Sequence, residues 1–540
     1  MLQEPYMLKL SGAAIAQYDI RKKITALIGE SNTRTFYEAW LNNHCTKTDI
    51  DSLAAWGFNS VRLPMHYNLF TLPVEQETIK GSNTWLSKGF TLVDSLLNWC
   101  KADHIYLILD LHATPGGQGN DNAIADRDPS QPSLWESEAN REKTIALWEK
   151  LAARYAKEEW IGGYDLINEP NWGFQDLSDK NGCNEKDNAQ LKDIYQRITK
   201  AIRNVDKEHL IFIEGNCWAN NFSGIFPLWD DNMAISFHKY WNYTNNASIQ
   251  KFLDYRNTYN VPVWMGETGE NSNAWFTDVV SLLEQNKIGW AMWPLKKSGL
   301  NNIFQVKIDP GMQRLIDYWN GHGSKPSADA AFSSLMQFAK NTNAKNNIVH
   351  HEVADAMMRQ VRSGDALPFR QNILKNNLVL YATDYDIGRS GVAYHDKDSA
   401  EYWVSTNVRT PWNIGGQYRN DGVDIEACKD AVSNGYDVAW IEPGEWLQYT
   451  VFSPEERQYD INIRSASKEK HGELALLVND ISSADIPLPL TGGTQVWKTS
   501  TIKNIKLAKG WNRIRVLAKA GGFNLNYLQF TTAENTARIN

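Results

Sequence analysis

Residues 162–171 read GGYDLINEPN, and this stretch indicates how the rest of the chain folds. Two glycines precede a short, mostly apolar run at 164–167, which is typical of a buried β-strand, and the run ends at an Asn-Glu-Pro triplet. Proline disfavours helical geometry in the residue before it, so we expect Glu169 to be extended at the tip of the strand. Its carboxylate would then point into the mouth of a barrel, where barrel enzymes place their catalytic groups.

A second stretch, VPVWMGE at 261–267, repeats this design and ends at Glu267. For either stretch alone, an ordinary glutamate at the corner between a strand and a loop is an equally good interpretation. Two carboxylates on one rim of a barrel, however, are what glycoside hydrolysis requires. One protonates the leaving oxygen, and the other attacks the sugar or activates water.

The region around these stretches alternates between strands and helices. The predicted strands lie at 59–63, 105–109, 164–167, 210–213, 233–237, 262–265 and 288–293. The predicted helices between them include 48–56, 86–101, 139–156 and 188–205, the first with Thr48 as N-cap and Asp51 three residues later. Strands that alternate with helices pair in parallel, and this many units favour a closed barrel over an open sheet.

Six motifs follow these strands in a characteristic order. They are VRLP at 61–64, DLH at 110–112, NEP at 168–170, FHKY at 237–240, GE at 266–267 and WAMW at 290–293. On these motifs the chain resembles glycoside hydrolase family 5, in the clan of retaining (β/α)8 hydrolases, over roughly residues 50–300. The resemblance implies an α/β fold of the (β/α)8 TIM-barrel type.

The resemblance also implies roles for individual residues. Glu169 would be the acid/base and Glu267 the nucleophile, with Arg62 close enough to favour its ionised form. Asn168 would hold the 2-hydroxyl of the reacting sugar.

The remaining barrel candidates orient these groups or contact sugar. His112, His238 and Tyr240 would orient the carboxylates and the sugar hydroxyls, and Trp293 would form the floor under the reacting ring. A packed histidine or a core tryptophan is the alternative for each taken alone. Weaker candidates for stacking on sugar rings are Trp172, Trp218, Trp241 and Trp264.

The N-terminal part begins with a sequence that in the family follows the first barrel strand. Residues 2–7 read LQEPYM, and 21–28 and 30–41 have a composition that favours helix. We therefore expect the barrel to start after its first strand, unless residues 1–30 contain an ordered parallel strand that closes it.

The pattern changes after the barrel. Helices are predicted at 326–341 and 347–362, and a linker follows at 363–375. From 376 to 540 the chain consists of short strand-like runs separated by Gly, Asn and Pro, which predicts an all-β sandwich of the jelly-roll type. The expected division is thus a catalytic barrel at 1–362, a linker and a second domain at 376–540.

The second domain resembles a family 6 carbohydrate-binding module. The resemblance rests on YRNDGVDI at 418–425, GYDVAWI at 435–441, GEWLQY at 444–449 and FNLNY at 523–527. It implies sugar binding by Trp440 and Asn524, but the position of the second aromatic ring falls on Thr494. The opening YATD at 381–384 lacks the glutamates that help to bind calcium in such modules. Sugar binding and a purely structural role are both consistent with this sequence.

Composition narrows the possible partners. The 540 residues carry a net charge of −8 and include 22 Trp, 22 Tyr and 18 Phe. An acidic chain without a Lys/Arg run argues against nucleic acid or an anionic membrane as partner. No run reaches the ~18 apolar residues of a membrane helix, and no export signal is visible at the N-terminus. The five cysteines are odd in number and lack a CxxC pair, so we interpret them as buried thiols.

Taken together, the sequence predicts a retaining glycoside hydrolase that acts on β-linked glucan, foremost an endo-β-1,4-glucanase. The alternatives are a β-1,3-glucanase, suggested by the loop HATPG at 112–116, a β-mannanase, and a non-catalytic carbohydrate-binding protein. The expected partner is a polysaccharide or oligosaccharide, with no metal and no cofactor. We expect the protein to be a monomer. We also expect it to be extracellular or periplasmic, because a polymeric substrate cannot enter a cell.

Overall fold

The fold was analysed in a computed structural model, which describes residues 14, 16–375 and 377–532. The chain forms two compact units. The first comprises Met1–Tyr240, Asn245–Gly269 and Leu283–Val349, and the second comprises Trp241–Thr244, Glu270–Leu282 and His350–Asn540. Each is described by itself.

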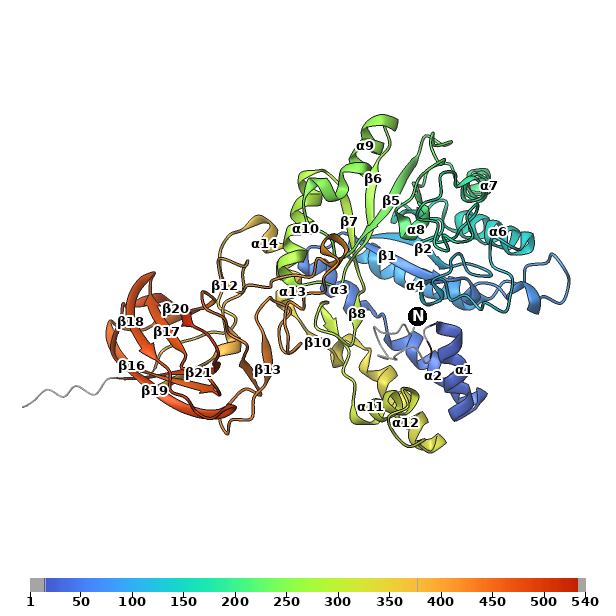
Figure 1. Ribbon diagram of the computed structural model, residues 1–540. Coiled ribbons are helices and arrows are strands. Elements are labelled where there is room, and N and C mark those ends of the chain that lie inside the picture. The colour runs from blue at the N-terminus through green and yellow to red at the C-terminus, as the bar shows by residue number, and fades with distance from the viewer. Residues whose placement is uncertain (1–13, 15, 376, 533–540) are drawn as a thin grey trace, which may run out of the picture. The chain divides into compact units, whose positions relative to one another are not determined.

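The first unit is a nearly closed barrel of seven parallel strands with helices between them (Figure 1). The strands are paired in chain order: β1 (Ser60–His66), β2 (Tyr106–Ala113), β3 (Ile161–Asp165), β4 (Ile211–Glu214), β5 (Met233–Lys239), β6 (Val263–Gly269) and β7 (Gly289–Trp293). The connecting helices are α4 (Ser87–Ala102), α6 (Glu138–Tyr155), α7 (Ala189–Val205), α9 (Gln250–Tyr259) and α10 (Asn273–Gln285), with short helices α5 (Asn122–Ala125) and α8 (Asn216–Ala219). The predicted TIM-type fold is confirmed.

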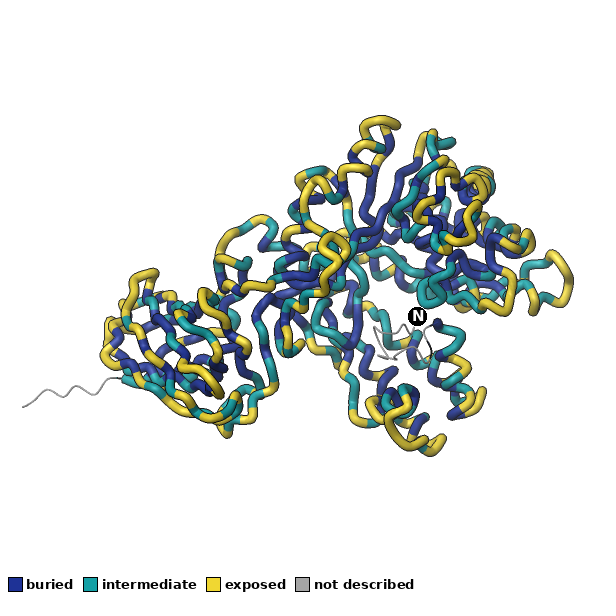
Figure 2. The backbone as a smooth tube through the Cα atoms, in the orientation of Figure 1, coloured by how far each residue is buried: buried dark blue, intermediate teal, exposed yellow. Residues whose placement is uncertain are grey.

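The central strands are buried, as Figure 2 shows by their dark blue colour. Every residue of β4, β5 and β6 is buried, because these parallel strands are covered on both faces. Strands β1 and β7 are mostly half-buried. They approach each other, but no residue pairing joins them in the described part of the chain.

Two helices precede β1 where the sequence favoured helix. They are α1 (Gln17–Ile28) and α2 (Glu30–Asn43), and their buried residues pack with those of α11 (Pro310–Trp319) and α12 (Ala328–Asn341). No strand lies in residues 16–30. Residues 1–13, where an additional strand was the alternative, lie outside the described residues.

The helix before β1, α3 (Lys47–Trp56), begins one residue before the predicted range 48–56. Its N-cap is Thr46 and not Thr48, since the Thr46 backbone N–H and hydroxyl both donate to Asp49 Oδ2, at 2.7 and 2.8 Å. The same spacing of Thr and Asp occurs twice in this segment, so sequence alone did not decide between the two caps. Asp49 is fixed by burial and by an ion pair with Lys296 at 2.6 Å.

The second unit is built on two antiparallel sheets, which confirms the predicted all-β fold. One sheet has the order β13 (Ile425–Ala427), β14 (Tyr436–Val438), β21 (Asn524–Thr532), β16 (Arg457–Ser467) and β19 (Gly493–Leu507), with β11 (Asn377–Tyr381) paired to β21. The other has the order β12 (Tyr394–His395), β15 (Trp446–Ser453), β20 (Gly510–Ala520), β17 (Glu473–Val478) and β18 (Ile481–Pro487). Alternate residues such as Tyr459, Ile461 and Ile463 fill the core between them.

The second unit also includes helices and residues outside the sheets. Helices α13 (His351–Met357) and α14 (Arg359–Arg362) precede its strands, and α15 (Trp403–Thr406) lies between β12 and β13. Residue 273 also belongs to this unit, and its amide donates to Asp421 Oδ1 at 2.9 Å, while the amide of Asn420 donates to Asn273 Oδ1 at 3.1 Å. In the first unit, three two-residue strands form a small separate sheet, namely β8 (Lys296–Lys297), β9 (Phe304–Gln305) and β10 (Ile348–Val349).

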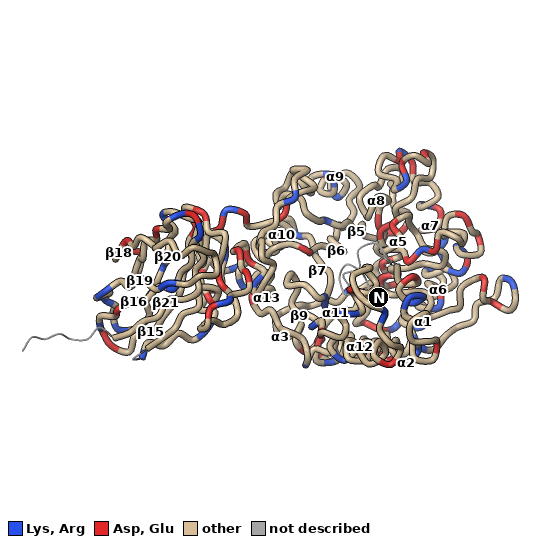
Figure 3. The backbone as a smooth tube through the Cα atoms, turned by 60° about the horizontal axis from the view of Figure 1, so that its bottom comes forward, with Lys and Arg blue, Asp and Glu red and all other residues tan. Residues whose placement is uncertain are grey.

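Charges of both signs are interspersed along both units, as Figure 3 shows. None of the helices in the described residues combines the length and the apolar character needed to cross a membrane.

Candidate active site

The predicted site residues of the barrel gather where its strands end. Arg62 lies on β1, His112 on β2, His238 on β5 and Glu267 on β6, while Asn168 and Glu169 follow β3. Residue pairing places His238 directly beside Glu267. The carboxyl ends of parallel strands meet at one edge of a barrel, so a single rim carries these groups.

Glu169 does not have the extended backbone predicted from the following proline. Its φ is 43°, in the left-handed region that non-glycine residues rarely occupy. Two hydrogen bonds hold it there: its N–H donates to Glu214 Oε2 at 2.6 Å, and Asn171 Nδ2 donates to its carbonyl at 2.9 Å. Strained backbone of this kind persists only where the surroundings fix it, and it is concentrated at functional sites.

The environment of Glu169 favours its protonated form. Burial raises the pKa of Glu169 to about 7, and the nearby charges of Glu267 and Glu214 act in the same direction. His238 Nδ1, at 2.7 Å from Glu169 Oε1, opposes this effect without cancelling it. A carboxyl group that still holds its proton near neutral pH can serve as a general acid.

Glu267 has a different environment, which supplies hydrogen bonds and positive charge. Tyr240 Oη donates to Glu267 Oε1 at 2.6 Å, and Arg62 Nη1 donates to Oε2 at 3.1 Å. The two glutamates thus differ in their partners: a histidine contacts Glu169, whereas a phenol and a guanidinium donate to Glu267.

The two carboxyl groups face each other closely. One oxygen of Glu169, one of Glu267 and a ring nitrogen of His238 all lie within 4.8 Å of one another. The exposed fractions of the two glutamates are 5% and 6%, so both are largely buried but still reached by solvent. In the described part of the chain these three side chains are also the group that could hold a metal ion. Because a carboxylate pair needs no metal to cleave a glycoside, we interpret their closeness as the spacing of an acid and a nucleophile.

Arg62 forms hydrogen bonds or ion pairs with most of the polar side chains of this site. It donates through Nε to Asp165 at 2.9 Å, and through Nη2 to Asn168 Oδ1 and Glu214 Oε1, both at 2.9 Å. Asp110 Oδ2 lies 3.2 Å from Nη1. Arg62 therefore fixes the position of Asn168 as well as that of Glu267.

Glu214, at the end of β4, was not predicted. It is fully buried, and its Oε1 lies 2.9 Å from Arg62 Nη2 and 3.1 Å from His238 Nε2. Although burial alone would raise it, the charges of His238 and Arg62 lower the pKa of Glu214 to about 2. A third apolar run that ends in a glutamate, IFIE at 211–214, was the available signal.

His112, Asn168 and Trp293 lie together as predicted. The rings of His112 and Trp293 are stacked, with centroids 5.0 Å apart and planes 7° from parallel. His112 Nδ1 lies 2.8 Å from Asp110 Oδ2, and its Nε2 lies 3.4 Å from Asn168 Nδ2. Gln118 Nε2 donates to the carbonyls of both His112 and Asn168 at 2.8 Å.

The weaker tryptophan candidates separate into two groups. Trp264 is buried in a core cluster with Ile108, Phe212 and Ala234, so its assignment to sugar binding is wrong. Trp172, Trp218 and Trp241 are half-buried, and the guanidinium of Arg127 lies 4.8 Å above the Trp172 ring. Trp241 belongs to the second unit.

Two of the cysteines form a disulfide, which corrects the prediction that all five are thiols. Cys183 and Cys217 are bonded, although 34 positions separate them in sequence. Their Cα atoms lie 4.8 Å apart because the connections after β3 and β4 meet. Free cysteines are Cys45, Cys100 and Cys428.

In the second unit, the predicted sugar-binding residues lie on neighbouring strands. Trp440 is 45% exposed and follows β14, whose Val438 pairs with Leu525 of β21. Asn524 is buried, and its amide donates to Glu426 and Asp437 at 2.8 and 2.7 Å. Gln495, next to Thr494, donates to the same two carboxylates.

Asp384, in the opening that lacks the calcium-binding glutamates, has contacts within the protein. It accepts from Tyr418 Oη at 2.5 Å and forms an ion pair with Arg370 at 2.9 Å.

Comparison with known families decides the assignment of the first unit. The family model described as cellulase (glycosyl hydrolase family 5) matches residues 19–299, which is more than half of the chain. The chain belongs to glycosyl hydrolase family 5. A model of carbohydrate-binding module family 35 matches residues 419–530, so this family 5 protein carries a C-terminal carbohydrate-binding module, although its motifs resembled family 6.

Curated relatives of the family 5 protein carry several activities in their names. A beta-xylosidase of Phanerodontia chrysosporium is 25% identical over 57% of this chain and 68% of its own length. Endoglucanase C of Acetivibrio thermocellus is 23% identical over 53% of this chain and 94% of its own. A probable glucan 1,3-beta-glucosidase A of Aspergillus clavatus is 22% identical over 47% and 58%.

Two solved structures are similar to parts of this chain. Endoglucanase Cel5A of Thermotoga maritima is 16% identical, covering 54% of this chain and 90% of its own, with a TM-score of 0.37. The C-terminal CBM6 of LamC, a laminarinase from Zobellia galactanivorans, is 21% identical, covering 29% and 100%, with a TM-score of 0.22.

Proposed function

We propose that this family 5 glycoside hydrolase cleaves β-linked glucan with retention of configuration, most specifically as an endo-β-1,4-glucanase. The carrying observation is the pair Glu169 and Glu267, whose nearest carboxyl oxygens lie within 4.8 Å in two contrasting environments. Retaining glycosidases place their carboxyl groups about 5–5.5 Å apart, and inverting ones about 6.5–9.5 Å apart, to leave room for water.

In the first step, a Glu267 oxygen attacks the anomeric carbon while Glu169 gives its proton to the departing glycosidic oxygen. Arg62 and Tyr240 hold the Glu267 carboxylate in place for the attack through their hydrogen bonds. In the second step, Glu169 removes a proton from water, which displaces Glu267 and releases the sugar with its original configuration. His238 positions Glu169 through the 2.7 Å contact.

The sugar itself would be held by the residues that border the carboxylates. Asn168 contacts the 2-hydroxyl, where a hydrogen bond strengthens in the transition state. Trp293, fixed by its stacking on His112, supports the ring from below. Trp440 and Asn524 of the second unit form a separate site of family 6 type, which brings the enzyme to its polymer.

The choice of β-1,4 glucan rests on the endoglucanases among the relatives and on the cellulase description of the matching family model. A β-1,3-glucanase is the second candidate, because the loop at 112–116 points to it and a glucan 1,3-beta-glucosidase is among the relatives. β-Mannan stays a third candidate.

A panel of substrates tests this proposal. Purified protein is incubated with cellulose oligosaccharides, β-1,3-glucan, β-mannan and β-xylan, and reducing ends are measured with and without Glu267→Ala. We expect release from β-1,4 glucan by the wild type alone, with the β-anomer formed first in NMR spectra. Release of the α-anomer would contradict retention. No release from any polymer would favour a non-catalytic carbohydrate-binding protein.

The proposal also covers the cellular location of the protein, the boundaries of its domains and its oligomeric state. We propose an extracellular or periplasmic location, supported by the disulfide, which persists in oxidising compartments, and by a polymeric substrate. Residues 1–362 would act as the catalytic part, 363–375 as the linker and 376–540 as the module. The protein would be a monomer, which light scattering can measure.

A further inference from the structure

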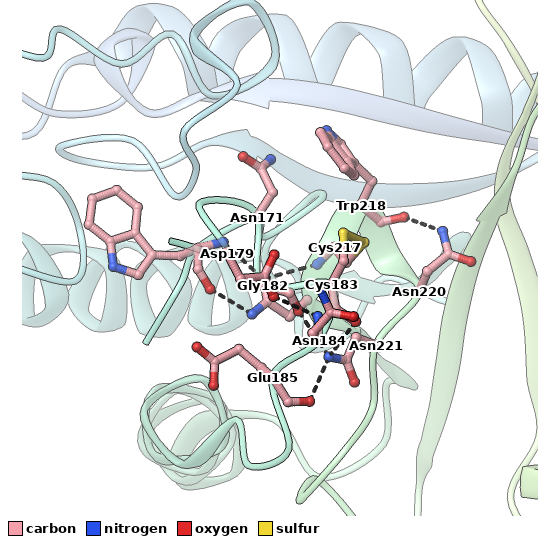
Figure 4. The surroundings of a disulfide bond; sticks show 12 residues. Asn171, Asp179, Gly182, Cys183, Asn184, Glu185, Cys217, Trp218, Asn220 and Asn221 are labelled. Carbon is pink, nitrogen blue, oxygen red and sulfur yellow. Dashed lines mark hydrogen bonds between the residues drawn. A yellow bond between two sulfur atoms is a disulfide. The ribbon is translucent and has the colours of Figure 1, made fainter. Parts of the chain in front are cut away.

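The connections that follow β3 and β4 are fastened together beside Glu169. The disulfide between Cys183 and Cys217 joins them directly, as Figure 4 shows. Asn221, in the second connection, donates through Nδ2 to the carbonyls of Gly182 and Glu185, both at 2.9 Å. The two connections therefore form one body and not two separate loops.

Asn216 adds a third fastening. Its Oδ1 accepts from the backbone N–H groups of Trp172 and Cys217, at 3.0 and 2.9 Å. Its Nδ2 donates to the Trp172 carbonyl and to Asn188 Oδ1, both at 2.8 Å. Asn216 is fully buried, so these bonds are shielded from competition by water.

The backbone held by these contacts is strained. Cys217, Trp218 and Ala219 have φ values of 55°, 53° and 63°, so three consecutive non-glycine residues are left-handed. Each costs free energy relative to ordinary backbone, and a run of three is unusual. Such a conformation persists where the surroundings impose it, and it indicates a functional constraint.

This strained segment connects to the backbone that presents Glu169. The N–H of Trp218 donates to the Pro170 carbonyl at 3.1 Å, and Pro170 follows Glu169 directly. Figure 4 shows the indole of Trp218 directed away from Asn221 and Glu185. The disulfide and Asn216 thus fix one body that contains the half-buried Trp218 and is hydrogen-bonded to the residue after Glu169.

We propose that Cys183, Cys217 and Asn216 are positioning residues for proton donation to the leaving group. This inference rests on the proposed function. In the first step the bond between the anomeric carbon and the glycosidic oxygen breaks, its electron pair stays on that oxygen, and the oxygen takes the proton of Glu169. When the disulfide is reduced to two thiols, the body loosens, and the proton no longer reaches the leaving oxygen in the right geometry.

The alternative is a disulfide that only stabilises the fold. The two roles differ in their dependence on the leaving group. A dinitrophenolate leaves without protonation, whereas a sugar alkoxide must be protonated as it leaves. Loss of positioning therefore slows cleavage of oligosaccharides selectively, and loss of stability affects both substrates equally.

The test compares kcat/KM for cellotetraose and for 2,4-dinitrophenyl β-cellobioside. Cys183 is exposed, so dithiothreitol can reduce the disulfide in the full-length wild type, and a Cys183→Ser/Cys217→Ser variant removes it permanently. We expect at least a tenfold loss with cellotetraose and less than a twofold change with the aryl glycoside. Reoxidation restores the wild type, and Cys428→Ser, which changes a free cysteine of the second unit, has no effect.

Equal changes with both substrates, or no change with either, would overturn the inference. The aryl glycoside also reports folding, because an unfolded variant hydrolyses neither compound. If the untreated wild type itself cleaves neither substrate, the proposed function has failed, which is a separate result.

Discussion

Replacement of Glu169 by Gln has opposite expected effects on stability and on activity. Burial raises the pKa of Glu169 from 4.5 to about 7. One pKa unit equals 1.36 kcal/mol. Relative to the unfolded chain, the folded protein therefore favours the protonated form of Glu169 over the ionised form by about 3 kcal/mol. Stability from this group is therefore fully present below pH 4.5 and is lost as the pH rises through 7. Gln is neutral at every pH and does not incur this loss.

The assay measures Tm for the wild type and Glu169→Gln at pH 4 and pH 8.5. At pH 4 we expect equal values. At pH 8.5 the variant should be higher by several degrees, because about 1 kcal/mol shifts Tm by roughly 2–4 °C in domains of 150–250 residues and by less in larger ones. Glu149→Gln, at an exposed position, serves as the control and should show no dependence on pH.

Activity tests the same carboxyl group. The wild-type kcat/KM for an oligosaccharide should fall about tenfold per pH unit above pH 7, because only the protonated acid can donate. The variant should lose activity at every pH. A variant that is less stable than the wild type at pH 8.5, or a wild-type profile without an alkaline limb near pH 7, would refute this assignment of the acid.

Three further predictions follow from individual contacts. Tyr240→Phe removes the 2.6 Å hydrogen bond to the nucleophile and should lower kcat/KM by about 10–100-fold with an unchanged fold, as activity and circular dichroism will show. Glu214→Gln removes a buried carboxylate that pairs with both Arg62 and His238 and should cost about 3 kcal/mol in denaturant unfolding, whereas Glu149→Gln should change it by less than about 0.5 kcal/mol. Trp440→Ala should weaken retention of the protein on insoluble glucan, and Trp511→Ala, at an even more exposed tryptophan of the same unit, should not; equal effects would contradict a site at Trp440.

Much of the barrel could be predicted because its strands are local patterns. Strands β3 and β6 are apolar runs that end at polar residues, and the catalytic candidates follow from those ends. Glu214 was missed because its importance comes from partners far away in sequence, such as Arg62, 152 positions earlier. Trp264 was misjudged because its burial against Ile108 and Phe212 depends on side chains from other strands.

Other features depended on the tertiary structure. The backbone of Glu169 was predicted as extended from the proline alone, but contacts with Glu214 and Asn171 override this preference. The disulfide could not be deduced from an odd number of cysteines. Cys183 and Cys217 can bond only because the connections after β3 and β4 lie side by side in the folded protein. In the second unit, the Lys, Thr and Asn residues of β19 resemble a loop in sequence, and its pairing with β16 makes it a strand.

The central claim is that Glu267 forms a covalent bond with the sugar while Glu169 supplies the proton. The most direct measurement uses 2,4-dinitrophenyl 2-deoxy-2-fluoro-β-cellobioside, whose fluorine slows both steps and whose leaving group favours the first, so that the glycosyl-enzyme accumulates. Mass spectrometry of peptides from the inactivated protein should find the sugar on Glu267. A sugar attached to Glu214 or Glu169, or turnover without any labelled peptide, would contradict the account.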